Sequence, residues 1–319
     1  MDRKKDHIEL AKKAQTNINR LDDRFYYEPL FSSLSENNIP ETNFAGKTLK
    51  YPVWISSITG GTALAKTINS NLAKLAGKYK LGMALGSCRC LLDSDNCLDD
   101  LNVRKYIGNQ ALYANLGIAQ IEQLIENGQI NKVNLMLQKI NADGLFIHIN
   151  PLQEIFQPEG DRYKKPAIET LKIFLDKIDF PVFVKEVGQG FGPKSLKALA
   201  KLNIQGIELA SYGGTNFAKL ELQRTGNNSP MAYVGNSLDE MIEILNNLDE
   251  KLPEIIVSGG IRNSLDGYYY IKKLKTKAVY GQAFAFLEKA TGSFETLEKY
   301  FLEQMQTLNC AYSFLELKK

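Results

Sequence analysis

The sequence predicts an α/β fold: a closed (β/α)8 TIM barrel with an N-terminal arm or helix and an extra C-terminal helix. Short apolar runs recur along the chain. Most gaps between them carry apolar residues at the helical spacing of three and four, and each run ends in polar or glycine residues. Strands that alternate with helices form parallel βαβ units, and eight such units close into a barrel of about 250 residues. The competing topology is a doubly wound open sheet, but its glycine-rich dinucleotide turn does not follow the first strand.

The expected elements can be placed along the chain from these patterns. Strands are expected at residues 51–56, 82–86, 111–115, 144–149, 181–186, 206–210, 254–258 and 277–281. Helices are expected at residues 3–18, 63–79, 166–178, 195–202 and 237–248. Pro166 suits a helix start, because its missing N–H has no partner there in any case. Residues 19–50 are rich in Asn, Ser and Pro and are expected to be irregular.

One domain is expected over residues 1–319, with an arm and lead-in at 1–50, the barrel at 51–290 and a C-terminal helix at 291–319. The composition, 44% hydrophobic and 24% charged, is that of an ordinary globular protein. The net charge of +3 gives no reason to expect nucleic acid or a membrane surface as a partner. No apolar run of about 18 residues exists, so no membrane span is expected.

Four cysteines are present, and three of them cluster at Cys88, Cys90 and Cys97, with Cys310 far away. No second pair completes a zinc site, so we expect free thiols in a reducing cytoplasm. The first ten residues are charged and lack an apolar segment, which excludes a signal peptide there. A cytoplasmic protein is therefore expected.

The stretch from His148 to Arg162 follows an apolar run and is the richest in candidate chemistry. If the chain stays extended beyond Pro151, Gln153 and Glu154 point to opposite sides, so that one faces a substrate and the other a metal ion. Asp161 and Arg162 are expected to pair and brace the loop. The alternative interpretation is a polar surface loop, but one of only two histidines in the chain lies here.

Glycines after the last two expected strands predict a phosphate site. Gly259-Gly260 and Gly281-Gln282 would offer backbone N–H groups, and the nearby Thr215 would add a hydroxyl. Lys185 ends the fifth expected strand, where a buried cation needs an anionic neighbour. A flavin satisfies both, with its phosphate in the glycine turns and its N1–C2 edge at the lysine. The alternative for Lys185 is a surface ion pair with Glu186.

A second anionic site is expected on the opposite side of the barrel mouth. Arg89 would lie there with Arg3, Lys4 and His7 from the N-terminal arm, and Glu154 would hold Mg²⁺ against a second phosphate. The alternative for the arm is a solvated surface helix, which is the commoner role of a basic cluster.

Together these motifs resemble the type 2 isopentenyl-diphosphate isomerases over nearly the whole chain. The specific motifs are Arg3-Lys4-x-x-His7 and His148-x-Asn150-x-x-Gln153-Glu154 with its Pro-Glu-Gly-Asp-Arg tail. Further support comes from Lys185-Glu186-x-Gly-x-Gly, Gly213-Gly214-Thr215 and Ser258-Gly259-Gly260-x-Arg262.

The resemblance implies interconversion of isopentenyl and dimethylallyl diphosphate with reduced FMN, Mg²⁺ and NADPH as reductant, in a homo-oligomer, either tetramer or octamer. It implies that Gln153 is catalytic and that Glu154 binds the metal. The implied FMN contacts are Ser57, Ile58, Thr59, Ser87, Asn115, Lys185, Thr215, Gly259, Gly260, Ile261, Gly281 and Gln282. The implied diphosphate contacts are Arg3, Lys4, His7, Ser87, Cys88, Arg89, His148, Asn150 and Gln153.

The sequence departs from the family pattern in several places. Cys88 stands where the family usually has Gln, Ile58 replaces Met, Phe217 replaces Trp, Tyr163 replaces Asp, and residues 267–283 are unusually rich in Tyr and Lys. The first alternative function is another FMN barrel enzyme of the 2-hydroxy-acid oxidase type. Such an enzyme needs a histidine base near the seventh strand, and no histidine follows His148. The second alternative is a phosphate-binding barrel without activity.

Overall fold

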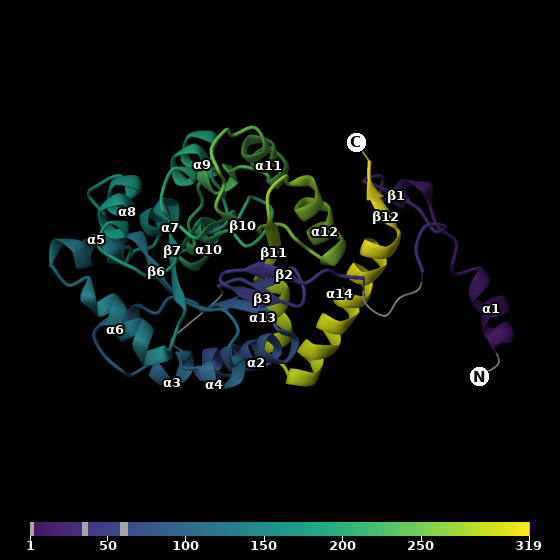
Figure 1. Cartoon of the computed structure of the whole chain (residues 1–319), viewed down its shortest axis with the longest axis horizontal. Coiled ribbons are helices and arrows are strands. Elements are labelled where there is room, and N and C mark those ends of the chain that lie inside the picture. The colour runs from purple at the N-terminus through teal and green to yellow at the C-terminus, as the bar shows by residue number, and fades with distance from the viewer. Residues whose placement is uncertain (1–2, 34–37, 58–62, 319) are drawn as a thin grey trace.

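A closed barrel of eight parallel strands forms the centre of this computed structural model, which describes residues 3–33, 38–57 and 63–318. Neighbouring strands pair in parallel in sequence order, and the last pairs with the first. The strands are β4 (Val53–Ile55), β5 (Gly82–Ala84), β6 (Leu112–Gly117), β7 (Gly144–His148), β8 (Val182–Lys185), β9 (Gly206–Glu208), β10 (Glu254–Val257) and β11 (Ala278–Gln282). The predicted fold class is confirmed, and every expected strand is present (Figure 1).

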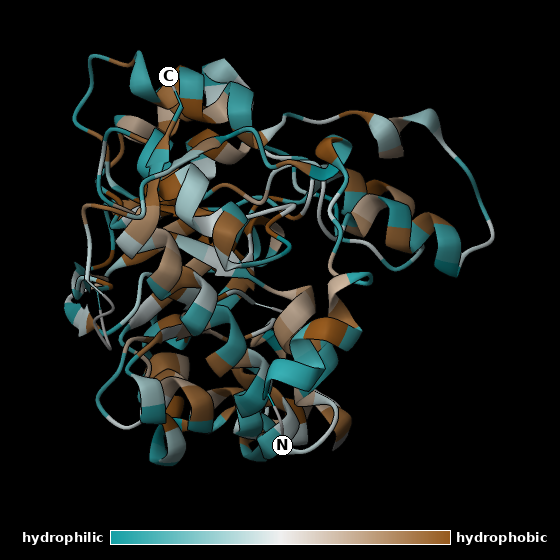
Figure 2. Ribbon diagram, turned by 90° about the vertical axis from the view of Figure 1, so that its right-hand side faces the viewer, coloured by the Kyte–Doolittle hydropathy of each residue, from teal (hydrophilic) through white to brown (hydrophobic). Residues whose placement is uncertain are grey.

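Helices surround this barrel. They are α2 (Ala63–Tyr79), α3 (Leu98–Leu101), α4 (Arg104–Ile107), α5 (Ile118–Glu126), α6 (Asn131–Ile140), α7 (Pro151–Phe156), α8 (Ala167–Leu175), α9 (Pro193–Ala200), α10 (Phe217–Arg224), α11 (Leu238–Asn246), α12 (Ser264–Lys273), α13 (Phe284–Ala290) and α14 (Phe294–Phe314). Hydrophobic and hydrophilic residues alternate along them (Figure 2), as expected of helices with one buried face. Local sequence fixes several starts: Ser237 and Glu240 form a capping box at α11, and Asn263 caps α12.

The side chains of the barrel strands alternate between two separate cores. Outward residues such as Val182 and Val184 join the large core beneath the helices. Inward residues such as Trp54, Phe146 and Phe183 form a second core inside the barrel. The rings of Phe146 and Phe183 stack with centroids 4.9 Å apart. This alternation follows from the two-residue period of a strand.

The amino end of the barrel is closed, which leaves the carboxyl end for ligands. The hairpin of β2 (Thr42–Phe44) and β3 (Lys47–Leu49) inserts Phe44 and Leu49 into the inner core. At its turn, the N–H of Ala45 donates to the Glu254 carboxylate over 2.8 Å. Toward the carboxyl end, the residues two places beyond the inner aromatic side chains are polar. They are Ser56, Asn115, His148 and Lys185. The same two-residue period therefore places a polar layer above an apolar one.

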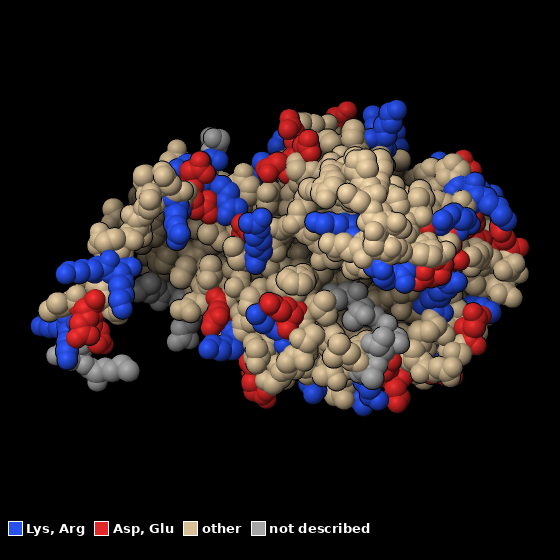
Figure 3. All heavy atoms as spheres, turned by 180° about the vertical axis from the view of Figure 1, so that it is seen from behind, with Lys and Arg blue, Asp and Glu red and all other residues tan. Residues whose placement is uncertain are grey.

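The two ends of the chain meet outside the barrel. Strand β1 (Phe25–Tyr27) pairs antiparallel with β12 (Leu315–Leu317), which follows α14. Before β1, helix α1 (Arg3–Ala11) has no buried residue and projects from the body of the molecule (Figures 1 and 3). The helix expected over residues 3–18 is thus shorter than predicted. Residues 19–50 were expected to be irregular, but their described part contains three short strands, because the pairing partners there come from distant or hairpin segments.

Two local predictions are wrong. Residues 151–156 form helix α7 instead of an extended segment, since Pro151 opens a helix where its absent N–H costs nothing. Cys90 and Cys97 form a disulfide bond, whereas all four cysteines were expected to be free. Cys88 and Cys310 are free thiols.

The visible surface carries charges of both signs. Lys and Arg side chains are interspersed with Asp and Glu over the face seen in Figure 3. Among the described residues, no helix is both long enough and apolar enough to cross a lipid bilayer.

Candidate functional site

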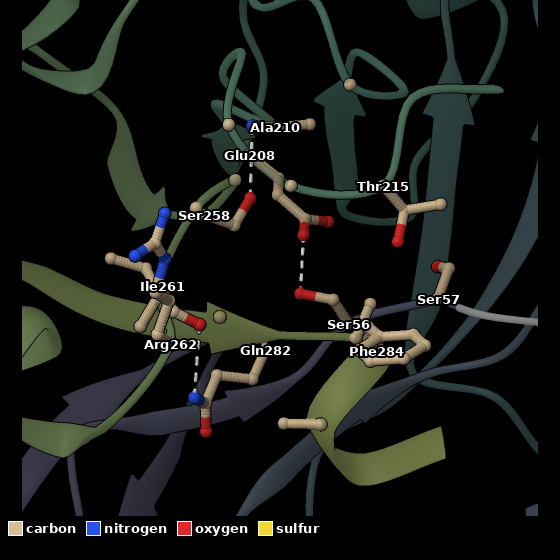
Figure 4. Close-up of a pocket in the computed structure, with 18 of the residues that line it drawn as sticks. Ser56, Ser57, Glu208, Ala210, Thr215, Ser258, Ile261, Arg262, Gln282 and Phe284 are labelled. Carbon is tan, nitrogen blue, oxygen red and sulfur yellow. Dashed lines mark hydrogen bonds between the residues drawn. The ribbon is translucent and has the colours of Figure 1, made fainter. Parts of the chain in front are cut away.

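A cavity of about 890 Å³ opens at the carboxyl ends of the barrel strands (Figure 4). Its wall combines Ser56 and Lys185 of the polar layer with the glycine turns after β9, β10 and β11. The lining residues used below are Ser56, Ser57, Lys185, Glu208, Gly213, Gly214, Thr215, Ser258, Gly259, Gly260, Ile261, Arg262, Gly281, Gln282 and Phe284. Most of the residues predicted from the strand ends to bind a phosphorylated ligand therefore lie around one cavity.

Lys185 is buried in this wall beside an acid that sequence analysis did not select. Its side chain is 8% exposed, and its Nζ lies 3.9 Å from Glu208 Oε2. The two residues are register partners on β8 and β9, so their side chains emerge on the same face. The alternative of a surface ion pair with Glu186 is wrong. The Glu186 carboxylate instead accepts hydrogen bonds from the N–H groups of residues 188, 189 and 190, and burial raises its pKa.

The glycines after β9 and β10 allow two loops to approach closely. A Cβ on Gly214 would lie 2.9 Å from the backbone nitrogen of Gly260, and Gly259 and Gly260 have φ angles of +90° and +75°. Side chains other than glycine are disfavoured in both situations. This cradle of exposed peptide groups is suited to a phosphate.

Arg262 adds a positive charge to the cradle that sequence analysis did not assign to the site. It lines the cavity, is exposed, and has no ion-pair partner in the described part of the chain. Its place directly after the Gly-Gly turn is the signal that points to it.

A second polar group lies at the ends of β6 and β7. His148 Nδ1 is 2.8 Å from Asn115 Oδ1, and Asn115 Nδ2 donates to Ser57 Oγ over 3.4 Å. Burial, and next the positive charge of Lys185, lower the pKa of His148 to about 3. The imidazole is therefore neutral at physiological pH. Since His148 and Lys185 are register partners on neighbouring strands, this group adjoins the cavity.

Helix α7 begins with the residues of the expected substrate and metal motif. Asn150 Nδ2 donates to Gln153 Oε1 over 3.1 Å and to Glu154 Oε1 over 3.0 Å. The other Glu154 oxygen accepts the N–H of Asp161 over 2.6 Å. Asn150 Oδ1 is buried without a hydrogen-bond partner among the described residues, which leaves an acceptor for a ligand. Gln153 itself does not line the main cavity.

One carboxylate, Glu154, is available for a cation at this place. The described residues contain no group of three or more His, Cys, Asp or Glu side chains arranged for a metal ion. A cation held at Glu154 would need its remaining ligands from a bound phosphate and water. Mg²⁺ commonly binds in that way, so the donor set suits it.

Arg89 joins the loop after β5 to the loop after α7. Its Nη1 lies 2.5 Å from Asp161 Oδ2, which also accepts a hydrogen bond from Gln120. The expected pairing of Asp161 with Arg162 is therefore wrong. Arg162 instead donates to the backbone carbonyl groups of Glu154 and Gly160.

Several predicted contacts are not brought to this site. The Cys88 side chain is fully buried and donates to the Gly86 carbonyl, and burial raises its pKa to about 12, so the expected ligand contact through this thiol is wrong. Arg3, Lys4 and His7 lie on α1, which stands away from the barrel (Figure 1). Ile58 and Thr59 lie outside the described residues. Ser87 is exposed at the end of β5, next to Arg89.

Glu208 and Ser56 are the main residues that sequence analysis missed. Ser56 Oγ donates to Glu208 Oε1 over 2.5 Å (Figure 4). The available signal was a single charged residue within the apolar run 206–210, because a charge in a buried strand requires a specific partner.

Comparisons with known proteins agree with this architecture. No protein-family model matches the chain. Among solved structures, a mandelate oxidase mutant with a monooxide FMN adduct superposes with a TM-score of 0.60 at 13% identity, covering 93% of this chain and 88% of that one. A flavocytochrome b2 double mutant with bound sulfite gives 0.61 at 15% identity, covering 90% of this chain and 71% of that one. At this identity they show the fold alone.

Sequence relatives extend the comparison beyond the fold. A Rickettsia peacockii protein named isopentenyl-diphosphate delta-isomerase is 30% identical over 321 residues, covering 97% of this chain and 90% of that protein. A Rickettsia typhi protein of the same name is 32% identical over 276 residues, covering 84% of this chain and 80% of that protein. With its (β/α)8 barrel and this full-length similarity, the chain belongs to the isopentenyl-diphosphate delta-isomerase family, in its type 2 branch.

Proposed function

We propose that the protein interconverts isopentenyl diphosphate and dimethylallyl diphosphate, using reduced FMN and Mg²⁺. The observation that carries the proposal is the side-by-side placement of two polar centres at one barrel mouth. Lys185 and the glycine cradle lie around the main cavity, and His148, Asn150 and Glu154 lie beside it. Family membership over nearly the whole chain supports the same conclusion.

FMN fits the main cavity on three counts. The volume of about 890 Å³ lies within the usual range of small-molecule sites. The cradle and Arg262 would hold the phosphate, and Lys185 would face the N1–C2 edge of the ring. Ser57, Asn115, Thr215, Ile261, Gly281 and Gln282 would line the remainder, with Ser87 at the edge. When bound and reduced, FMN supplies a proton donor and acceptor at N5.

The residues beside the cavity would hold the substrate. Arg89 and His148 would bind its diphosphate, with Asn150 beside them, and Glu154 would place Mg²⁺ against it. Isomerisation adds a proton to the terminal carbon of the double bond and removes one from the methylene carbon next to the double bond, so no electrons are gained or lost overall. Gln153 would lie near the reacting carbons. The apolar surroundings would keep water from the developing cation.

The proposal also covers the role of the N-terminal arm, the reductant, the location and the assembly. Arg3, Lys4 and His7 would reach a diphosphate only if α1 moved or met another copy of the chain, since α1 projects from its own barrel. NADPH is proposed as reductant, the cytoplasm as location, and a homo-oligomer of one-domain chains as the assembly.

A purified-protein assay tests the function. The protein should show a flavin absorbance spectrum and convert isopentenyl diphosphate only after reduction by dithionite or NADPH. The same preparation should not oxidise 2-hydroxy acids, in line with the lack of a histidine after His148. Conversion of a 2-hydroxy acid without isomerase activity would favour the oxidase alternative. Flavin binding without either reaction would favour a binding module.

A further inference from the structure

Glu208 is a buried acid in the cavity wall for which the proposed reaction supplies no task. The residue is 1% exposed and lies on β9, between Lys185 on β8 and the glycine cradle formed by the turns after β9 and β10. Ser56 fixes one carboxylate oxygen by donating to Oε1 over 2.5 Å. The side chain is therefore held in place by Ser56, which directly follows β4 (Figure 4).

Within the described part of the chain, Glu208 and Lys185 each have a polar side-chain atom without a hydrogen-bond partner. Glu208 Oε2 is buried and has no hydrogen-bond partner there. Lys185 Nζ lies 3.9 Å away, which is close enough for charge interaction but too long for a hydrogen bond. Buried charged groups rarely remain without such partners. A ligand in the cavity would supply both an acceptor for Lys185 and a donor for Glu208.

We propose that Glu208 is a positioning residue for the flavin, and that its negative charge limits how strongly Lys185 stabilises the reduced cofactor. This inference rests on the proposed use of FMN. The two side chains carry opposite charges 3.9 Å apart in a buried wall, where charge interactions are weakly screened. A flavin gains negative charge toward N1 on reduction, so Lys185 alone would favour the reduced form. Glu208 opposes that preference, and its free Oε2 accepts a hydrogen bond from a ribityl hydroxyl.

The midpoint potential of bound FMN tests this role, because a purely structural side chain would not change it. Glu208→Gln keeps the size and the Ser56 contact but removes the charge. We expect reduced FMN to bind about tenfold more tightly relative to oxidised FMN, which raises the two-electron midpoint potential by about 30 mV. Glu208→Asp keeps the charge and should stay close to wild type. An unchanged potential in Glu208→Gln, or equal weakening of both flavin forms, would overturn the proposal.

A paired variant covers the case in which Glu208→Gln leaves Lys185 unbalanced and does not fold. Lys185→Gln/Glu208→Gln removes both charges together, which costs less stability than removing one. If the charges offset each other, its midpoint potential should lie nearer to wild type than that of Lys185→Gln. If Lys185→Gln also fails to fold, the double variant is compared with wild type instead. A midpoint potential of the double variant that lies more than about 30 mV below wild type would then overturn the proposal, since this shift corresponds to a tenfold change in the relative affinity for the two flavin forms.

Glu254→Gln is the matched control for removing a barrel glutamate. Glu254 lies on β10 at the opposite end of the barrel, where it accepts hydrogen bonds from Ala45 and Gln205. Its substitution should leave the midpoint potential unchanged. A wild-type protein that binds no FMN would reject the proposed function itself. Flavin-bound, active wild type with an unaltered potential in Glu208→Gln would reject only this inference.

Discussion

The environment of His148 illustrates how neighbouring strands set the properties of one side chain. Asn115 Oδ1 has no hydrogen to give, so the Nδ1 atom of His148 must donate in their 2.8 Å contact. In the neutral ring, Nε2 then keeps a lone pair and donates nothing. A diphosphate accepts hydrogen bonds at neutral pH, so His148 needs a second proton in order to bind it through Nε2.

Diphosphate binding should therefore be coupled to proton uptake. The ligand's negative charge would raise the pKa of His148, which burial and Lys185 now hold at about 3. Calorimetric titration with inorganic pyrophosphate at pH 7, in buffers of different ionisation enthalpy, should show up to one more proton taken up by wild type than by His148→Gln. Equal proton uptake in the two proteins would contradict a His148 contact with the ligand.

The same histidine should make the free protein less stable in acid. The unfolded chain binds a proton near the ordinary pKa of 6.5, whereas the folded chain does not until about pH 3. Protonation thus favours the unfolded state, and stability falls as pH drops through this window, by at most about 1.4 kcal/mol per pH unit. The free energy of unfolding, obtained from urea denaturation at pH 7 and at pH 5, measures this loss of stability. His148→Gln should lose less stability over that interval than wild type.

Glu154→Gln should weaken the binding of Mg²⁺ without loss of FMN. The amide is a poorer ligand for Mg²⁺ than the carboxylate, so half-maximal activity should require at least about tenfold more Mg²⁺. Activity as a function of Mg²⁺ concentration, together with flavin content, measures this. Glu159→Gln is the control, because Glu159 lies in the loop directly after α7 but pairs with Arg224 at the surface. An identical Mg²⁺ response in both variants would remove the metal assignment.

At the scale of elements, the loop after β5 is held at several places. The Cys90–Cys97 disulfide closes it, and Asp93 and Asp95 pair with Lys132 and Lys139 of α6. The loop begins beside Arg89, so its order affects where that guanidinium lies. Cysteine spacing alone did not predict this bond, because sequence does not report how closely the two Cα atoms, here 6.3 Å apart, approach.

Breaking this disulfide should lower stability by up to about 2.5 kcal/mol, the chain-entropy value for a loop of this size. Thermal unfolding with and without dithiothreitol should show the loss in wild type. Cys97→Ser should not respond to the reductant, and Cys310→Ser should respond as wild type does, since Cys310 is a free exposed thiol. Finding four free thiols in the unreduced protein would contradict the bond.

The elements themselves were well predicted wherever a local pattern defines them. The expected helix at 63–79 coincides with α2, and the expected helix at 237–248 includes α11. Helix α7 was missed, because six residues are too few to show helical periodicity. The candidate site was predicted in part: sequence selected Lys185 but not Glu208, since their proximity depends on the register of β8 and β9.

For the whole molecule, the pairing of β1 with β12 joins the N-terminal lead-in to the end of α14. Backbone N–H groups of Glu28 and Lys318 extend the pairing on either side. Phe25 of β1 packs on the rings of Tyr268 and Tyr269 of α12. Tyr268 and Tyr269, two of the unusual tyrosines in residues 267–283, thus form part of the surface that contacts the N-terminal lead-in.

Truncation after Phe314 should release the lead-in while leaving the barrel folded. Residues 25–27 would lose their pairing with β12, whereas Glu28 keeps the carbonyl of Phe314 as its partner. The amide hydrogens that pair with β12 should therefore exchange at least about tenfold faster. Hydrogen-exchange mass spectrometry would show this change alongside unaltered protection of β6 and β7. Glu316→Gln, an exposed substitution within β12, should leave the exchange of residues 24–28 unchanged. Protection that survives the truncation would show that the packing of Phe25 alone holds this segment.

The sequence by itself determined the barrel, because apolar runs, helical periodicity and polar strand ends are local patterns that recur in a fixed order. It also pointed to the barrel end at which the cavity opens. Tertiary structure alone decided the partners of the charged groups: Lys185 with Glu208, and Arg89 with Asp161. It also decided that α1 stands away from its own barrel. These features depend on strand register and on contacts between distant segments, which no local pattern specifies.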